Sequence, residues 1–404
     1  MNLKEKTRLL FVISALEAGG AEKSLINLLN LIDYDRYYVD LLLFKKKGVF
    51  INQIPPTVKV IEAPDDLYFL FNISGRGIKR AIASFSSVLA RVVGTAYRNL
   101  IIKNKSYPGT QIRWNKFYKK RISVLKDEYD VAISYMHGEV MYYVAEKVNA
   151  KKKITWVHND YKATKLQPQL DLPYFNAFDH IVTISRECVD IFVQVFPQLK
   201  NRTVCIPNLT SSKLIRNLAN AYYPQEYKDC FDSGKKIILS IGRLSYQKGF
   251  DIAVEIASEL KQRGLAFVWY VLGQGEEQKN LIDLVKRYDV ENEIVFLGVR
   301  ENPYPYIRFA DIIAQPSRFE GKSVVLDEAK ILCKPIVVSD YATVLDQIKS
   351  EQEGIVAKLD VEDFSTALES LMKSEDKRRK LEGYLEQHEY GNEDSIALYY
   401  KIME

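Results

Sequence analysis

Short apolar runs alternate with segments of helical period along the whole chain. In the first half, apolar and β-branched runs predict strands at 8–15, 38–44, 58–62, 130–134, 153–157, 180–184 and 203–208. A second series begins with KKIILSIGRL (235–244) and continues through AFVWYVLG, EIVFLG, DIIAQPS and PIVVSD. Strands that alternate with helices are typical of parallel sheets with crossover helices. The expected fold class is α/β, with ligands held where the strands end.

The length of 404 residues exceeds one compact core and predicts two domains of roughly 200 residues. The polar, irregular stretch 209–233 separates the two strand series, and we interpret it as a linker. The expected organisation is a first domain over 1–208, a linker over 209–233 and a second domain from 234. The two domains would face one another across a cleft that holds the ligand.

The first strand runs into Gly19 and Gly20 and then into a helix from about Ala21. A P-loop would need glycine at positions 17 and 22, and both are glutamates, so a triphosphate-binding loop is excluded. Two interpretations stay open for the glycine pair. It is either a tight turn or a place where the backbone and a helix N-terminus approach an anionic ligand.

The composition indicates the cellular compartment. The spacing of the four cysteines, Cys188, Cys205, Cys230 and Cys333, fits neither a disulfide framework nor a metal site, and we expect no signal peptide. The apolar runs are all shorter than the roughly 20 residues that a membrane-spanning helix needs. We therefore expect a reduced, cytoplasmic protein that does not cross a bilayer.

The stretch 76–126 contains 13 Lys or Arg and no Asp or Glu. Within it, apolar residues recur at helical spacing: Ile78, Ile82, Phe85, Leu89, Val92 and Val93. Basic and apolar faces together favour an anionic membrane surface as partner. Nucleic acid is the rival partner, and a solvated basic face without a partner is the third interpretation.

The run QPSRFEGKSVVLDEAKILCKPIVVSD predicts an extended segment, a turn at Glu320-Gly321 and a helix from Lys322 or Ser323. Glu328 falls in the middle of this helix's apolar arc, whereas Asp327 and Lys330 fall on the side expected to face solvent. A buried carboxylate is costly unless it is paired or binds a ligand. Glu328 is therefore either a ligand contact or a core residue with a hydrogen-bond partner.

A second candidate site follows the strand that ends at Ile241-Gly242. Arg243 and Lys248 lie in the loop before the next helix. Two cations beside a glycine at the carboxyl end of a strand can bind a diphosphate without a metal ion. The alternative is an ordinary basic surface loop.

These segments together resemble a known family. EGKSVVLDE places two glutamates eight positions apart, after GRLSYQKG, the IPN at the domain junction and the N-terminal GGAE. In this order, over nearly the whole chain, the motifs resemble the large family of retaining nucleotide-sugar glycosyltransferases with the GT-B fold. The resemblance implies two Rossmann-like domains, an acceptor-side domain over 1–208, a donor-binding domain over 234–385 and a C-terminal helix in 386–404 that packs back on the first domain.

The resemblance also implies roles for individual residues of the second domain. Arg243 and Lys248, beside Gly242, would bind the donor diphosphate, and Glu328 would accept hydrogen bonds from the ribose. Glu320 would contact hydroxyl groups of the transferred sugar. The backbone N–H groups that would assist it belong to the donor-binding segment Gly321, Lys322, Ser323 and Val324.

In the first domain, Gly19 and Gly20 would let the backbone close over the phosphates. His158 ends a strand and would lie near the transferred sugar; a structural, hydrogen-bonded histidine is the alternative. Asn208 matches the IPN motif, but the glycine that often follows it is replaced by Leu209, which leaves its role open. Lys322 stands where the family often has an aromatic residue, and it would meet either an acidic sugar or solvent.

No metal is implied. Asp33-Tyr34-Asp35 formally matches the D-x-D of metal-dependent sugar transferases, but it follows the first helix at the wrong edge of the sheet, so a turn explains it better. We expect a nucleotide sugar as co-substrate, without a cofactor, and no nucleic acid.

The expected function is a retaining, metal-independent transfer of a sugar from a nucleoside-diphosphate sugar, with UDP as the expected nucleotide, to a glycan acceptor on a lipid pyrophosphate. This chemistry would take place at the inner face of the cell membrane, in assembly of a bacterial capsule, O-antigen or other surface polysaccharide. Two alternatives stay open: an enzyme of the same fold with a soluble acceptor, and a non-catalytic sugar-binding partner of a transferase.

Overall fold

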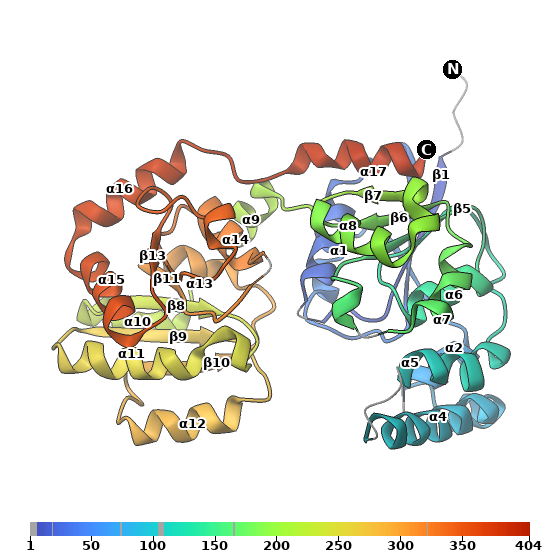
Figure 1. Ribbon diagram of the computed structural model, residues 1–404, viewed down its shortest axis with the longest axis horizontal. Helices are drawn as coiled ribbons and strands as arrows, with labels where there is room; N and C mark the ends of the chain where they lie inside the picture. Colours follow the sequence, from blue (N-terminus) through green and yellow to red (C-terminus); the bar gives the residue numbers. More distant parts are fainter. Residues whose placement is uncertain (1–5, 18, 73–74, 104–108, 165, 321) are drawn as a thin grey trace. The chain divides into compact units, whose positions relative to one another are not determined.

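The computed structural model (Figure 1) describes residues 6–17, 19–72, 75–103, 109–164, 166–320 and 322–404. The chain divides into two compact units. The first unit consists of Met1–Thr210 and Glu393–Glu404, and the second of Ser211–Asn392.

In the described part of the first unit, seven parallel strands form one sheet in the order β3-β2-β1-β4-β5-β6-β7. The strands are β1 (Thr7–Ile13), β2 (Tyr37–Leu43), β3 (Lys59–Ile61), β4 (Glu128–Ser134), β5 (Asn149–Val157), β6 (His180–Thr183) and β7 (Thr203–Cys205). The helices are α1 (Gly20–Leu31), α2 (Asp65–Phe71), α3 (Ile78–Ala83), α4 (Phe85–Lys103), α5 (Gly109–Arg113), α6 (Glu139–Lys147), α7 (Pro168–Phe175), α8 (Arg186–Val195) and α17 (Ile396–Met403). A π-helical turn, η2 (Trp114–Tyr118), follows α5.

In the described part of the second unit, six parallel strands form a sheet in the order β10-β9-β8-β11-β12-β13. They are β8 (Lys236–Ile241), β9 (Phe267–Leu272), β10 (Ile294–Gly298), β11 (Ile312–Gln315), β12 (Ile336–Ser339) and β13 (Ile355–Ala357). The helices are α9 (Ser212–Ala219), α10 (Lys228–Ser233), α11 (Phe250–Gln262), α12 (Gln278–Arg287), α13 (Tyr304–Phe309), α14 (Val324–Ile331), α15 (Val361–Lys373) and α16 (Glu375–Glu386).

Each sheet is covered on both faces, which explains the continuous apolar runs in the sequence. Leu9 to Ile13 of β1 are fully buried, and successive side chains pack into different clusters on the two faces. The same holds for β9, where Trp269 and Val271 face one cluster and Tyr270 faces the other. Parallel strands buried on both faces carry apolar residues at nearly every position. The α/β prediction of two parallel sheets is therefore confirmed.

The segment 209–233 is not the irregular linker that its polarity suggested. It contains α9 and α10, and Ile215, Ala219 and Tyr227 are buried in one core cluster of the second unit. Lys213, Arg216 and Asn217 lie on the exposed face of α9, and a count of polar residues cannot distinguish such a helix from a linker.

The last helix, α17, belongs to the first unit. Tyr399 stacks on Trp156 of β5, with ring centroids 5.6 Å apart, and its hydroxyl donates to Pro207 O at 3.0 Å. The backbone N–H of Asp33 donates to the Tyr400 hydroxyl at 2.9 Å. The division between the units falls at Glu393 rather than at residue 386, because the segment after α16 still belongs to the second unit: Tyr390 packs on its core and donates to Glu353 Oε1 at 3.0 Å.

Both sheets have a topological switch at their centre. In the first, the chain proceeds from β1 outward to β3 and returns with β4 on the other side of β1. In the second, it proceeds from β8 to β10 and returns with β11 beside β8. In open parallel sheets, the loops that leave the carboxyl ends of the two central strands diverge at this point and leave room for a ligand.

Asp33 ends the loop after α1 in a turn, as expected: its carboxylate accepts the Asp35 N–H at 2.9 Å. The four cysteines are free thiols. None of the helices that the structure describes has the length and apolar character needed to cross a bilayer.

Candidate functional site

The second unit brings two of the candidate residues into direct contact at its switch point. Lys248 lies in the loop after β8, and Glu320 lies in the loop after β11. The Lys248 ammonium lies 2.5 Å from Glu320 Oε1, and both side chains are largely buried. A cation and a carboxylate are thus fixed side by side where the two central strands end.

Gly249 allows these two loops to approach one another. Its φ of +65° lies in the left-handed region, and a Cβ at this position would lie 2.0 Å from Pro316 O. The Arg318 N–H also donates to Gln247 O at 2.8 Å, which ties the loops together through their backbones. Any residue with a side chain at 249 would have to push the β8 loop away from the β11 loop.

The Glu320 carboxylate is held by further donors from the same edge of the sheet. Ser317 Oγ donates to Oε1 at 2.8 Å, and Gln247 Nε2 donates to Oε2 at 3.2 Å. Thr343, in the loop after β12, donates its hydroxyl to Glu320 O at 2.9 Å. These contacts fix the orientation of the Glu320 carboxylate, as recognition of a polar ligand requires.

Gly242 makes room for Lys248. A Cβ on Gly242 would lie 3.1 Å from both Cδ and Cε of Lys248, so the lysine stem passes over the glycine. Arg243 follows directly, is exposed, and forms no ion pair with the acidic side chains that the structure describes. One buried and one exposed cation therefore stand beside a backbone without a side chain, which suits a diphosphate.

Glu328 lies on the buried face of α14, as its position on the apolar arc predicted, and is only 1% exposed. The hydroxyl of Tyr304 donates to Glu328 Oε1 at 3.4 Å, and burial beside this carboxylate raises the pKa of Tyr304 well above its usual value. The structure thus gives Glu328 a hydrogen-bond partner within the core. At this exposure the Glu328 side chain is closed to solvent.

The N-terminus of α14 is anchored by Gln347. Gln347 Oε1 accepts the Ser323 N–H at 3.0 Å, and its Nε2 donates to Ser323 O at 2.5 Å and to Asp327 Oδ1 at 2.9 Å. Val324 is the first helical residue and is half-buried. Gly321 lies outside the described residues. One side chain therefore fixes the segment whose N–H groups were assigned to the donor.

Two lysines near this helix differ in surroundings. Lys322 is exposed and pairs with Asp327 at 3.1 Å. Lys330 was expected on the solvent side, and this was wrong: it is buried, donates to Gln347 O at 2.7 Å and lies 3.6 Å from Glu353. A buried ammonium needs such partners, and they come from a loop more than ten residues downstream.

In the first unit, the glycine pair follows β1 at the switch point. Gly20 is exposed, begins α1, and has no atom within 4 Å of where a Cβ would stand. Over Gly19 the corresponding space is filled by the Glu22 carboxylate, 2.2 Å from the Cβ position. Burial raises the pKa of Glu22. The backbone is therefore open to a ligand at Gly20, whereas at Gly19 the Glu22 side chain would first have to turn away.

His158 ends β5 and packs against the segment after β4. Its Nε2 lies 3.0 Å from Tyr135 O, and since a carbonyl can only accept, Nε2 carries the proton. Burial lowers the pKa of His158 to about 4, with the charge of His137 adding to the effect and the Asn208 side chain opposing it. The imidazole is therefore neutral at pH 7, with Nδ1 as an acceptor on the side of Asn208.

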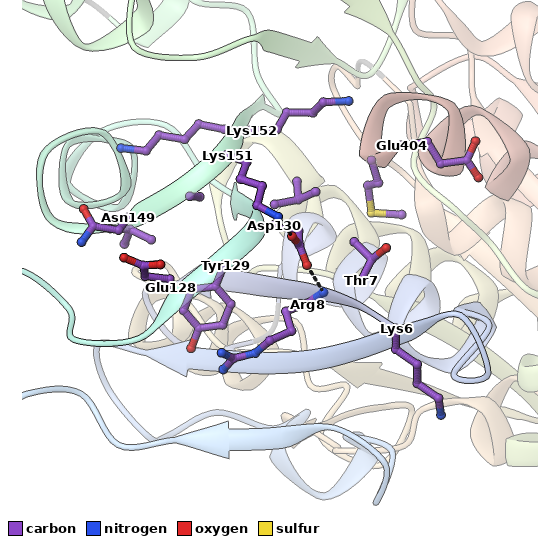
Figure 2. Close-up of a pocket in the computed structure, with 15 residues that line it drawn as sticks. Lys6, Thr7, Arg8, Glu128, Tyr129, Asp130, Asn149, Lys151, Lys152 and Glu404 are labelled. Carbon is purple, nitrogen blue, oxygen red and sulfur yellow. Dashed lines mark hydrogen bonds and ion pairs between the residues drawn. The ribbon is translucent and has the colours of Figure 1, made fainter. Parts of the chain in front are cut away.

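A cavity of about 960 Å³ lies at the opposite edge of the first sheet (Figure 2). It is lined by the first residues of β1, β4 and β5 and by the end of α17. One of its acidic side chains, Asp130, accepts from Lys151 at 2.7 Å and from the Arg8 N–H at 2.8 Å. It takes no part in the candidate site, which lies at the carboxyl ends of the strands.

Comparison with known proteins bears on the second unit directly. Residues 227–388, which contain Arg243, Lys248, Glu320 and Glu328, match the model of the family described as glycosyl transferases group 1. The matched segment makes up most of the second unit, which consists of Ser211–Asn392.

Curated relatives are glycosyltransferases as well. An uncharacterised glycosyltransferase of Methanocaldococcus jannaschii is 26% identical over 219 residues, 52% of this chain and 54% of the relative. The amylovoran biosynthesis glycosyltransferase AmsD of Erwinia amylovora is 29% identical over 153 residues, 38% of this chain and 43% of AmsD. The match therefore spans about half the length of these relatives or less.

A third relative, from Campylobacter jejuni, is 31% identical over 146 residues, 36% of this chain and 39% of its own length. Its name is N-acetylgalactosamine-N,N'-diacetylbacillosaminyl-diphospho-undecaprenol 4-alpha-N-acetylgalactosaminyltransferase.

Solved structures match nearly the whole length of this chain. HepE of Anabaena, solved in complex with UDP, has a TM-score of 0.62 at 16% identity. The match includes 98% of this chain and 98% of HepE. TarM of Staphylococcus aureus, solved with UDP, matches 98% of this chain and 99% of its own, with a TM-score of 0.64 at 12% identity. At such identities the likeness shows the fold, and it confirms the predicted GT-B class.

The sequence did not indicate several polar residues that organise the site. They are Gln247, Gln315, Ser317, Thr343 and Gln347. Gln315 is the last residue of β11, and the others follow the carboxyl end of β8, β11 or β12; this position is the one signal that could have marked them. Isolated Gln, Ser and Thr residues in loops are too common to be chosen without the distances.

Proposed function

We propose that this protein is a retaining glycosyltransferase that moves a sugar from a UDP-sugar to a glycan acceptor. The observation that carries the proposal is the Lys248–Glu320 pair at the switch point of a group 1 glycosyltransferase domain. It sets a group that binds phosphate beside a group that binds hydroxyls, which is what a sugar diphosphate requires. The UDP bound to HepE and TarM supports UDP as the nucleotide.

In the proposed reaction, the bond between the anomeric carbon and the diphosphate oxygen breaks, and the acceptor oxygen forms the new bond on the same face. The departing phosphate oxygen takes the proton of the acceptor hydroxyl. Lys248 keeps Glu320 on one N–H and has two further N–H donors for the phosphate, and Arg243 is available from the loop surface. These fixed cations would stabilise the leaving group as its charge grows, so the reaction is proposed to need no metal ion.

The first unit is proposed to supply contacts on the acceptor side. Neutral His158, with Nδ1 as acceptor, suits a hydrogen bond from a hydroxyl of the transferred sugar. Gly20 offers an open backbone next to the α1 N-terminus, which favours an anion. Glu328 is proposed to accept the ribose hydroxyls once the first turn of α14 shifts.

The acceptor is proposed to be carried on a lipid pyrophosphate at the cytoplasmic face of the cell membrane. The name of the Campylobacter jejuni relative includes a sugar linked to diphospho-undecaprenol. The name of AmsD includes biosynthesis of amylovoran. The name of AmsD supports a proposed role in assembly of a bacterial surface polysaccharide. The basic stretch 76–126 supports an anionic membrane as partner.

A thermal-shift screen against UDP-, GDP- and other nucleotide sugars tests the donor, with Glu328→Ala measured in parallel. At a concentration 100 times the dissociation constant, a bound donor adds about 2.7 kcal/mol to the free energy of unfolding. A shift with UDP-sugars that Glu328→Ala loses supports the proposal. A wild-type protein that no nucleotide sugar stabilises contradicts it and favours a non-catalytic partner of a transferase.

A further inference from the structure

Helices α3 and α4 present their apolar side chains to solvent. Along this short segment, six large apolar residues are between 43% and 79% exposed: Ile78, Ile82, Phe85, Leu89, Val92 and Val93. On α4, the last four of these fall within an arc of about 100°, the width of the apolar stripe that a helix of a globular protein normally turns inward. We call these six residues the α3–α4 apolar face.

The inner side of α4 is made of small residues. Ser87 and Ala90 are almost fully buried, and Gly94 packs so closely that a Cβ would lie 3.1 Å from Arg113 and 3.5 Å from Phe117. Figure 1 shows α4 at the outside of the first unit, beyond α2 and α5, with which it packs. Among the side chains of α4 that the structure describes, Ser87, Ala90 and Gly94 therefore face the protein, whereas Phe85, Leu89, Val92 and Val93 face outward.

The α3–α4 apolar face favours an apolar partner, and the basic residues around it indicate the kind of partner. The stretch 76–126 contains 13 cations and no acid. Arg76 and Arg113 are paired with Asp65 and Glu139, but Lys79, between two residues of the apolar face, is exposed and forms no ion pair with the described acidic groups. An acidic or neutral protein surface would match one of these properties, whereas a bilayer with anionic headgroups matches both.

We propose that the α3–α4 apolar face inserts into the headgroup region of an anionic bilayer and holds the first unit on the membrane. Insertion goes beyond electrostatic adsorption, because the apolar side chains leave water. The part of the binding due to Lys79 and its basic neighbours weakens with salt, and the part due to Phe85, Leu89 and the other apolar residues persists. The inference names the surface by which the proposed function would reach a lipid-linked acceptor, but its test needs neither donor nor acceptor.

Flotation of the full chain with lipid vesicles tests the proposal. We expect binding to vesicles of phosphatidylcholine with phosphatidylglycerol, and much weaker binding to phosphatidylcholine alone. Phe85→Ser combined with Leu89→Ser should lower the partition coefficient by roughly tenfold for each side chain removed. The matched control is Phe231→Ser combined with Leu345→Ser, which removes two side chains of the second unit that are 76% and 71% exposed.

The depth of residue 89 in the bilayer is measured by fluorescence quenching, with the variant Leu89→Trp and vesicles that contain brominated phosphatidylcholine. The native tryptophans Trp114, Trp156 and Trp269 are fully buried, so lipid bromine should quench chiefly the new indole. Strong quenching that persists at high salt supports insertion. A wild-type protein that does not float with anionic vesicles overturns the proposal, as does equal flotation of the Phe85/Leu89 variant or an unquenched indole.

A second copy of the chain is the other occupant that the test separates. If the face joined two copies, sedimentation would show a dimer that Phe85→Ser dissociates while vesicle binding stays unchanged, and the proposal would fall. Donor-induced thermal shifts of the same variants in solution should equal those of the wild type. Failure of membrane insertion can thus be told from failure of the proposed transferase function.

Discussion

Lys248 Nζ and Glu320 Oε1 lie 2.5 Å apart, although 72 residues separate them in the sequence. The contact joins the loops that leave the two central strands of the second sheet. It therefore makes the phosphate-binding and sugar-binding functions of the proposed donor site depend on one another: a change to either residue should affect both.

Replacing Lys248 by methionine should slow transfer by about a hundred- to a thousandfold, since loss of one fixed cation from the leaving group costs about 2.7–4 kcal/mol of transition-state stabilisation. Arg243→Ala should have a similar effect. The measurement is kcat with saturating donor. Lys279→Met, an exposed lysine of α12, is the control and should leave kcat unchanged. Equal rates for Lys248→Met and Lys279→Met would remove Lys248 from the mechanism.

Gly249→Ala should lower both stability and activity. A left-handed backbone costs a residue with a side chain about 1–2 kcal/mol, and the new Cβ would also clash with Pro316 O. Gly264→Ala is a matched control, because Gly264 has φ of +73° but no atom within 4 Å of its Cβ position. In denaturant unfolding, both variants should lose stability, and Gly249→Ala should lose more than Gly264→Ala. Only Gly249→Ala should also have a lower kcat. If the two variants behave alike, the close approach of the loops is not needed.

Gln347→Leu should weaken donor binding. It leaves the Ser323 N–H and the Asp327 carboxylate without their amide partner, at a cost of about 1–3 kcal/mol in the free energy of unfolding. The donor KM should rise because the first turn of α14 is no longer held in place. Gln352→Leu, an exposed glutamine five residues further on, is the control. A KM equal to that of the control would show that Gln347 does not position the donor segment.

The stability of the fold should depend on His158 as the pH falls. Burial depresses the folded-state pKa from 6.5 to about 4, so the unfolded chain binds the proton first. The contribution is fully present above pH 6.5 and is lost as the pH falls toward 4, by up to about 3 kcal/mol. Unfolding curves of wild type and His158→Gln at several pH values measure it. The variant should show the shallower slope, and parallel slopes would mean that His158 is not held neutral by the fold.

Transfer should proceed without an added metal ion, because Arg243 and Lys248 supply the positive charge at the leaving group. We expect the rate after treatment with EDTA to stay within about twofold of the untreated rate, which corresponds to less than 0.5 kcal/mol. Restoration of a lost rate by Mg²⁺ or Mn²⁺ would contradict the assignment of these cations.

The sequence predicted the architecture well because parallel strands buried on both faces leave long apolar runs. The strand β13 was missed, although β3 and β7, which are equally short, were predicted. The prediction of a linker over 209–233 was wrong because α9 is short and half of its residues are polar, although Ile215 and Ala219 recur at helical spacing.

For the site, the sequence could place Lys248 and Glu320 at the carboxyl ends of strands but not in contact, since their contact depends on the backbone conformation of Gly249. Lys330 was misplaced for the same kind of reason: Glu353 and Gln347 reach it from another loop, and their approach leaves no local signal. Long-range polar contacts are set by loop geometry, whereas strand and helix positions are set by local periodicity.

The measurement that tests the account most directly follows the anomeric proton by NMR while the wild-type protein turns over a UDP-sugar with a lipid-diphosphate-linked glycan. The account predicts release of UDP together with a product whose new glycosidic bond has the anomeric configuration of the donor. A product of inverted configuration, or no transfer from a UDP-sugar that binds, would contradict it.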